Sequence, residues 1–160
     1  MSNEIKVGIS DYKITQYPDK LITLGLGSCV GIAIYDKANK IGGLSHIMLP
    51  DSSFFKERLK AEKFADLAIP KMVDEIKRRY NSRNLVAKIA GGASMFNFPE
   101  KKMISDIGSR NVLAVEQKLK ELNIPILSSL TGGNMGRTMI VDLDTFQIII
   151  RTAHRDIIKL

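Results

Sequence analysis

The sequence predicts an α/β fold in which mixed β-sheets are combined with helices. Short segments rich in β-branched and apolar residues, bounded by glycine and proline turns, predict at least seven strands. Two longer segments carry apolar residues at the helical period and predict two principal helices. Short loops between some strands indicate antiparallel hairpins, whereas the first helix is long enough to join parallel strands. The sheets are therefore predicted to be mixed.

The predicted strands follow one another along the chain and leave two longer stretches without regular structure. Residues 11–20, which include Pro18, are predicted to be an irregular link, and residues 97–107 an exposed loop. The turn of residues 36–40 makes its two flanking strands a hairpin. The predicted strands are residues 4–9, 21–24, 32–35, 44–49, 85–90, 126–130, 138–143 and 146–151.

The two predicted helices are residues 54–81 and residues 112–122, in which apolar residues recur close to every 3.6 positions. Pro70 lies within the first of them and has no N–H to donate. We therefore expect either a kink at Pro70 or a new helix with Pro70 in its first turn. Pro125 follows the end of the second helix.

Composition excludes several classes of function. A chain of 160 residues is expected to form a single domain, residues 1–160, with its own core. The single cysteine excludes an internal disulfide and a CxxC metal site, and it favours a reducing, cytoplasmic setting. Without a long apolar run or a signal-peptide pattern, membrane insertion is not expected. The net charge of +7 favours an acidic partner, but scattered basic residues and 6% aromatics argue against nucleic acid.

Cys29 and His46 are the residues with the clearest catalytic potential. Cys29 precedes one strand of the predicted hairpin, and His46 lies in the other strand, 17 positions later. Strand pairing can therefore bring sulfur and imidazole together. A histidine beside a cysteine takes up the thiol proton, stabilises the thiolate as an ion pair and later protonates the leaving group. Backbone N–H groups at Gly27 and Ser28 could then bind the oxyanion of a tetrahedral intermediate.

A structural interpretation of Cys29 competes with the catalytic one. A lone cysteine is commonly a buried, inert, small hydrophobic residue. The glycine-rich turn before Cys29 and the histidine downstream match the pattern of a candidate nucleophile. From the residues alone, both interpretations stay open. His154, close to the chain end, is not expected to be catalytic.

Five sequence blocks, taken together and in order, resemble the chemoreceptor glutamine deamidase family, CheD. Each block taken singly is weak evidence, whereas the ordered set is specific and spans most of the chain. The blocks are residues 24–30 (LGLGSCV), 46–50 (HIMLP), 88–96 (KIAGGASMF), 107–111 (IGSRN) and 131–137 (TGGNMGR).

The resemblance implies a three-layer α/β sandwich with mixed sheets and helices packed outside, related to bacterial toxin deamidases. It implies a catalytic triad of Cys29 as nucleophile, His46 as base and Thr23 as the residue that orients the base. The implied reaction converts glutamines of methyl-accepting chemotaxis receptors to glutamate, with no cofactor or metal. Without the resemblance, Thr23 would be interpreted as an ordinary β-branched strand residue.

Other functions use the same features. The resemblance also implies a regulatory binding module that docks a CheC-type chemotaxis phosphatase, and Met95 and Phe96, after the Gly91-Gly92 pair, are the candidate contacts. A core position for Met95 and Phe96 is the alternative. A cysteine protease or a transglutaminase would use the same nucleophile, and methylester hydrolysis is compatible with it as a side activity.

Overall fold

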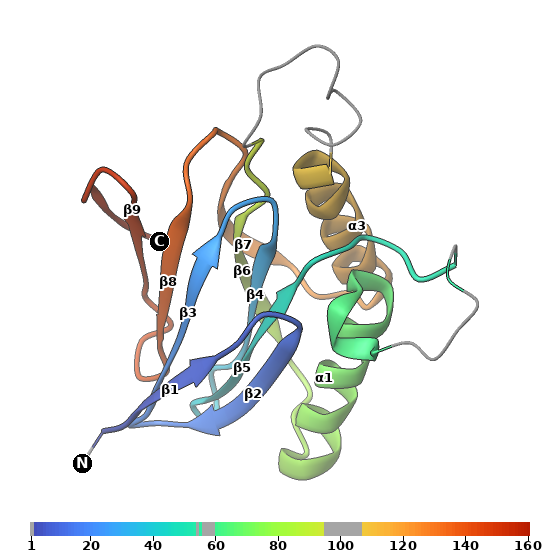
Figure 1. Cartoon of the computed structure of the whole chain (residues 1–160). Helices are drawn as coiled ribbons and strands as arrows, with labels where there is room; N and C mark the ends of the chain where they lie inside the picture. Colours follow the sequence, from blue (N-terminus) through green and yellow to red (C-terminus); the bar gives the residue numbers. More distant parts are fainter. Residues whose placement is uncertain (1, 54, 56–59, 95–106) are drawn as a thin grey trace.

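The structure is a computed structural model that describes residues 2–53, 55, 60–94 and 107–160 (Figure 1). Its strands form two five-stranded sheets. The first, called the outer sheet, has the order β1-β3-β8-β9-β10, and the second, called the central sheet, has the order β2-β5-β4-β6-β7. The strands are β1 (Glu4–Val7), β2 (Asp11–Gln16), β3 (Lys20–Leu26), β4 (Val30–Asp36), β5 (Ile41–Ile47), β6 (Val86–Gly91), β7 (Ile126–Thr131), β8 (Arg137–Asp142), β9 (Ile148–Thr152) and β10 (Ile157–Lys159).

Both sheets are mixed, which confirms that part of the prediction. In the outer sheet, β1 pairs with β3 in parallel and the remaining pairs are antiparallel. In the central sheet, β6 and β7 are parallel and the remaining pairs are antiparallel. The predicted hairpin is present as β4 and β5, whose register pairs Val30 with Ile47 and Asp36 with Ile41.

The sheets and helices form three layers, with the central sheet in the middle (Figure 1). Helices α1 (Ala65–Tyr80) and α3 (Ile107–Glu121) pack on one face of the central sheet, and the outer sheet packs on the other. Strand β4 is buried on both faces. Ile32 and Ile34 belong to the core under the helices, whereas Ala33 and Tyr35 belong to the core between the sheets. Successive residues of a strand point to opposite faces of the sheet, so a strand that is covered on both faces contributes alternate residues to two cores.

The predicted irregular link of residues 11–20 is wrong. Residues Asp11 to Gln16 form β2, an edge strand of the central sheet that pairs with β5 along its full length. Most of its residues are polar or half-exposed, so the sequence shows no clear alternation of apolar and polar residues. Tyr12 and Ile14 nevertheless pack against the helix-side core. Pro18 follows the strand and does not interrupt its hydrogen bonds.

Both helix boundaries also differ from the prediction. Helix α1 begins at Ala65, so Pro70 lies in its second turn, and the expectation of a new helix with Pro70 in its first turn is wrong. Helix α3 begins at Ile107 and not at residue 112. The reason is Gly108, which predicts a loop but lies in the first turn of α3. A Cβ there would lie 2.4 Å from the Ala93 carbonyl oxygen.

The C-terminal segment contains a further strand that the sequence did not predict. Strand β10 pairs with β9 in an antiparallel register, and Leu160 exchanges two backbone hydrogen bonds with Ile148. In the described residues, no helix has the length and apolar character needed to cross a membrane.

The fold brings several distant segments together at one end of the sheets. The β3–β4 connection, the end of β6, the β7–β8 connection and the start of α3 all lie in the upper part of Figure 1. Backbone hydrogen bonds join them: the Ala93 N–H donates to Gly27, and the Ser94 N–H donates to Gly133. Cys29 lies in this region.

Candidate active site

Cys29 lies in the short connection between β3 and β4, and its side chain is partly exposed. Just before the connection, the register of β3 against β8 shifts between Thr23 and Leu26, where Gly25 has a φ of 71°, in the left-handed region that glycine adopts without strain. The Cys29 carbonyl accepts a hydrogen bond of 2.8 Å from the N–H of Gly92, beyond the end of β6. The nucleophile candidate is therefore tied to the central sheet, and it packs partly buried against the core between the sheets.

His46 is fully buried in β5, and its ring is held by Thr23 from the outer sheet. Nδ1 of His46 lies 2.7 Å from the Thr23 hydroxyl oxygen. The only proton of that hydroxyl is donated to the Val7 carbonyl at 2.8 Å. The Thr23 oxygen must therefore accept from Nδ1–H, which leaves the lone pair of the neutral ring on Nε2. This contact favours the tautomer in which Nε2 carries the lone pair and can accept a proton.

Strand register brings Cys29 and His46 to the same face of the central sheet. His46 pairs with Gly31 across the β4–β5 ladder, and Cys29 precedes Gly31 by two residues. Cys29 itself lies in the bend before β4 and packs against the core between the two sheets, the side on which Thr23 contacts the His46 ring. Nε2 of His46 is buried and has no hydrogen-bond partner among the described residues.

Burial sets the protonation state of this pair. Loss of contact with water lowers the pKa of His46 to about 4. Burial also raises the pKa of the Cys29 thiol, against a smaller opposing effect of its own backbone N–H. At neutral pH the resting pair is therefore a thiol and a neutral imidazole. This differs from the preformed thiolate–imidazolium ion pair that the sequence suggested.

The carbonyls around Cys29 are all held from one side. Gly27 accepts from the Ala93 N–H at 2.8 Å, and Ser28 accepts from the Asn111 side chain at 2.9 Å. A trans peptide directs its N–H away from its carbonyl. The N–H groups of Ser28 and Cys29 consequently point away from these donors, and no described backbone carbonyl accepts from them. The Gly27 N–H already donates to Gly25, so Ser28 and Cys29 are the better oxyanion donors.

Two residues that the sequence did not indicate, Gly91 and Arg137, hold the backbone next to Cys29. Gly91 has a φ of 112°, and a Cβ on it would lie 2.2 Å from the Cys29 carbonyl oxygen, so a side chain is excluded. Buried Arg137 donates to the carbonyls of Gly91 at 3.0 Å and Leu130 at 2.8 Å, and also to that of Gly132. Burial lowers the pKa of Arg137. The only sequence signal for these residues was their place in the motif blocks.

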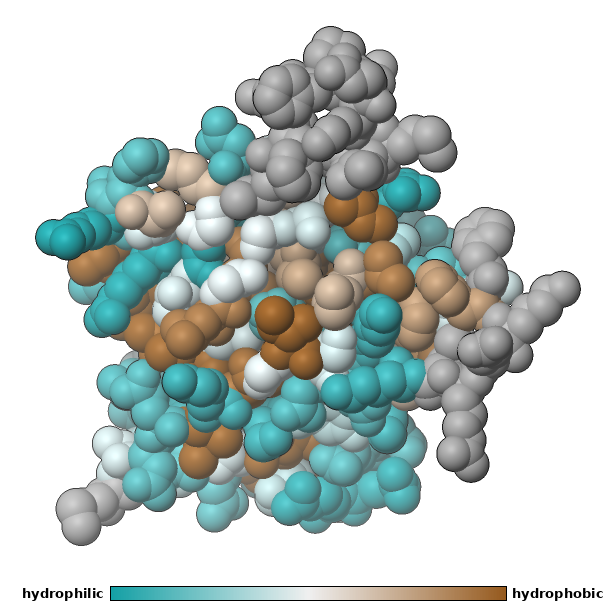
Figure 2. Space-filling model, in the orientation of Figure 1, coloured by the Kyte–Doolittle hydropathy of each residue, from teal (hydrophilic) through white to brown (hydrophobic). Residues whose placement is uncertain are grey.

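Exposed apolar side chains flank the Thr23–His46 pair. Leu24 follows Thr23 and is 46% exposed, and Met48, two residues after His46, is 36% exposed. Ile9, 55% exposed, precedes Ser10, whose N–H donates to the His46 carbonyl at 2.9 Å. Figure 2 shows apolar surface in the middle of the face that Figure 1 presents in front. We call Ile9, Leu24 and Met48 the apolar rim.

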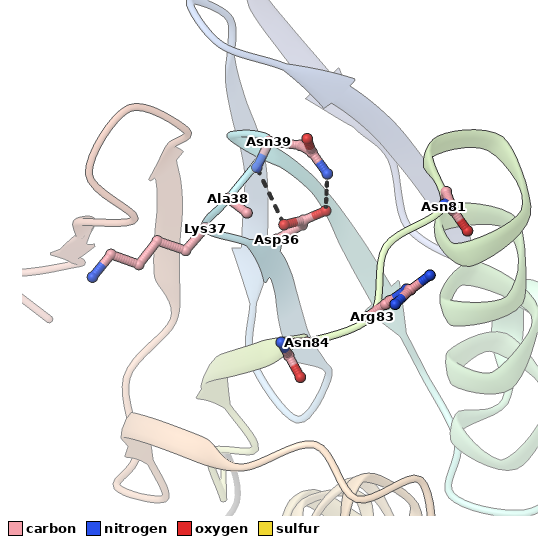
Figure 3. A pocket seen from close by; sticks show the side chains of 7 residues that line it. All are labelled: Asp36, Lys37, Ala38, Asn39, Asn81, Arg83 and Asn84. Atoms are coloured by element: carbon pink, nitrogen blue, oxygen red, sulfur yellow. Dashed lines mark hydrogen bonds between the residues drawn. The ribbon is translucent and has the colours of Figure 1, made fainter.

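A polar hollow lies at the other end of β4, about 20 Å from Cys29 at the rise of a strand. It is lined by the β4–β5 turn and by residues that follow α1 (Figure 3). Its buried carboxylate, Asp36, accepts from the Asn39 backbone and side chain and from the Ser82 hydroxyl. Because these oxygens already have partners, the cluster fastens the turn to the chain after α1 and is separate from the Cys29 region.

Two predicted site residues, Met95 and Phe96, lie outside the residues that the structure describes. Across residues 2–53, 55, 60–94 and 107–160, no three His, Cys, Asp or Glu side chains gather as a metal site would require. The candidate reactive groups in the region of Cys29 are its thiol, the neutral imidazole of His46 and the backbone N–H groups of Ser28 and Cys29.

Comparisons with known proteins agree on one family. Residues 48–152 match the family model described as CheD chemotactic sensory transduction. Proteins of Clostridium botulinum strain Hall and of Clostridium kluyveri, both named "Probable chemoreceptor glutamine deamidase CheD", are 57% identical over 150 residues. Each alignment covers 93% of this chain and 93% of the relative. The solved hypothetical protein YfiH of Bacillus licheniformis is similar with a TM-score of 0.48 and 14% identity, over 78% of this chain and 51% of that one.

The buried imidazole makes stability depend on pH. In the unfolded chain a histidine binds a proton near pH 6.5, whereas native His46 does so only near pH 4. The unfolded state therefore binds more protons in this window, and stability falls as the pH falls. We expect a loss of about 2 kcal/mol from pH 8 to pH 5, measured by urea unfolding. This loss disappears in H46N and persists in H154Q, which alters an exposed histidine. An equal pH dependence in H46N would contradict the assignment.

Proposed function

The chain belongs to the CheD family, a family of chemoreceptor glutamine deamidases, and we propose that it hydrolyses glutamine side chains of methyl-accepting chemotaxis receptors through Cys29, His46 and Thr23. By this membership it is an enzyme, a hydrolase acting on a side-chain carboxamide. The observation that carries the residue assignment is the hydrogen bond between Thr23 and Nδ1 of His46, which leaves Nε2 free as a base.

In the first half of the proposed reaction, the Cys29 sulfur attacks the carbonyl carbon of the glutamine side chain. Nε2 of His46 takes the thiol proton as the bond forms, because the resting thiol and imidazole are both neutral. The N–H groups of Ser28 and Cys29 bind the oxyanion of the tetrahedral intermediate. The His46 imidazolium then protonates the departing nitrogen, ammonia leaves and a thioester remains on Cys29.

In the second half, His46 again acts as the base and Thr23 as the residue that orients it. Nε2 removes a proton from water, which attacks the thioester carbon, and the proton passes to the Cys29 sulfur as glutamate is released. Throughout the cycle the Thr23 oxygen accepts from Nδ1–H. This bond strengthens when the ring is an imidazolium, because a charged donor binds more strongly than a neutral one.

The surface around the site supports a protein substrate with acidic character. The net charge of +7 favours association with glutamate-rich receptor helices. The apolar rim provides contacts for the apolar side chains that neighbour a glutamine on a packed helix. The dependence of the reaction on a free thiol supports a reducing, cytoplasmic setting. The kinship with bacterial toxin deamidases that the resemblance implies is proposed on this thioester chemistry alone.

We expect C29A to abolish ammonia release from a receptor fragment and H46A to lower its rate by at least about 10²-fold, because each removes a reacting group. Mass spectrometry of the fragment identifies the reaction. Deamidation adds about one dalton, proteolysis cuts the chain and transamidation adds the mass of the amine. H154A serves as the folded control with unchanged activity. Full activity in C29A would contradict the proposal, and cleavage products would favour the protease alternative.

The role of Thr23 is tested by a matched pair of variants. T23S keeps the hydroxyl that accepts from Nδ1–H, whereas T23V keeps the branched shape and loses the oxygen. We expect T23S to keep kcat within about threefold of the wild type. T23V should lower kcat about 10- to 100-fold, because the imidazole loses its orientation and preferred tautomer. Equal kcat values for the two variants, both folded by circular dichroism, would exclude the orienting role.

A docking role with a CheC-type phosphatase rests on the family resemblance, with Met95 and Phe96 as the candidate contacts. This role can coexist with catalysis, since docking needs no reacting group. We expect a pull-down of the phosphatase to survive C29A and to be lost in folded F96D, while F96D retains its thermal stability. Unchanged binding of F96D would argue against these contacts and leave the deamidase proposal untouched.

A further inference from the structure

Asn111 of α3 is a fully buried polar residue that joins the two halves of the candidate site. Its side-chain nitrogen donates to the Ser28 carbonyl at 2.9 Å and to the Met48 carbonyl at 2.9 Å. Ser28 directly precedes the nucleophile candidate Cys29, and Met48 lies two residues after the base His46. One amide group therefore links the helix, the Cys29 connection and the end of the strand that carries the imidazole.

The orientation of the Asn111 amide follows from its partners. Both partners are backbone carbonyl oxygens, which accept hydrogen bonds and cannot donate them. The amide nitrogen must therefore face them, and its two protons are both used. The remaining side-chain oxygen is buried and has no partner among the described residues. A buried acceptor without a partner is unfavourable for stability, so stability alone does not account for an asparagine at this position.

The bond to Ser28 acts on the peptide group that contains the Cys29 N–H. In a trans peptide, the carbonyl and the N–H point in opposite directions. By holding the Ser28 oxygen toward α3, Asn111 directs the Cys29 N–H away from the helix, to the side on which no described backbone carbonyl meets it. Donation to the carbonyl also polarises the peptide and strengthens its N–H as a donor.

We propose that Asn111 is a positioning residue for deamidation, which holds the Ser28–Cys29 peptide so that the Cys29 N–H faces the oxyanion of the tetrahedral intermediate. The inference rests on the proposed function of Cys29. The hydrogen bond from Asn111 to the Met48 carbonyl also ties the end of the strand that bears His46 to the same peptide. Asn111 touches neither substrate nor sulfur in this role, and its effect is on the intermediate and not on the reactivity of the thiol.

Two variants of Asn111 and two rate measurements test this role. N111L removes both donated hydrogen bonds, and N111D keeps the shape but loses donors when ionised. We expect each to lower kcat for a receptor fragment at pH 8 by about 10²-fold, the effect of a lost oxyanion donor, with KM within about threefold. The alkylation rate of Cys29 by iodoacetamide should stay within about threefold, because attack on a saturated carbon forms no oxyanion.

The pH dependence of N111D adds a measurement that a purely structural role would not change. A carboxyl group facing two carbonyls can donate one hydrogen bond once it is protonated. We expect the kcat of N111D, divided by that of the wild type at the same pH, to rise as the pH falls from 8 to 5.5. His46 stays neutral over this range, since its pKa is about 4.

S82A is the matched control, because Ser82 is a buried residue whose hydroxyl donates to Asp36 at the far end of β4. It should lose stability and keep kcat. An unchanged kcat in N111L, a parallel fall of kcat and alkylation rate, or failure of both Asn111 variants to fold would overturn the inference. A C29A variant that keeps full activity would instead overturn the proposed function, so the two failures are distinguishable.

Discussion

The hydrogen bond between Thr23 and His46 is the interaction on which the proposed site depends, and it crosses the interface between the two sheets. His46 lies in β5 of the central sheet and Thr23 in β3 of the outer sheet. The bond therefore exists only when the sheets are packed with the correct register. The Val7 carbonyl takes the hydroxyl proton, and this leaves Thr23 able only to accept from the ring. Packing of the core thus determines which imidazole nitrogen carries the lone pair.

The backbone around the nucleophile candidate Cys29 is held by neighbouring backbone N–H groups together with the Asn111 side chain. The connection of residues 27–29 is held by hydrogen bonds from the start of the loop after β6 and from α3. These contacts need very close approaches, which is why Gly91 and Gly108 tolerate no side chain without movement of their neighbours. Arg137 donates to the carbonyl of Gly91 at the end of β6 and to that of Gly132 after β7, and so joins these two strand ends. Backbone groups held in this way do not have to reorganise when charge develops on a substrate.

The candidate site residues that the sequence alone indicated are those that lie close together along the chain. Cys29 and His46 flank one hairpin, and the turn between its strands is visible in the sequence. Thr23 lies on another sheet, so only the family resemblance suggested it. The roles of Asn111 and Arg137 depend on carbonyls distant in the chain, and no periodic pattern records such contacts. The missed strand β2 has the same cause, because its pairing with β5 involves residues about 30 positions away and its own sequence shows no clear alternation of apolar residues.

The protonation state of the buried pair has a further consequence for reactivity. Burial lowers the pKa of His46 to about 4 and raises that of Cys29, so both changes oppose transfer of the proton at rest. The thiolate, and not the thiol, is the form that reacts readily with oxidants and electrophiles. A cysteine kept neutral by burial is therefore less reactive toward oxidants. In the reaction that we propose, attack on the substrate carbonyl would place negative charge beside the Ser28 and Cys29 N–H groups, and this stabilisation, absent at rest, would favour proton transfer to His46.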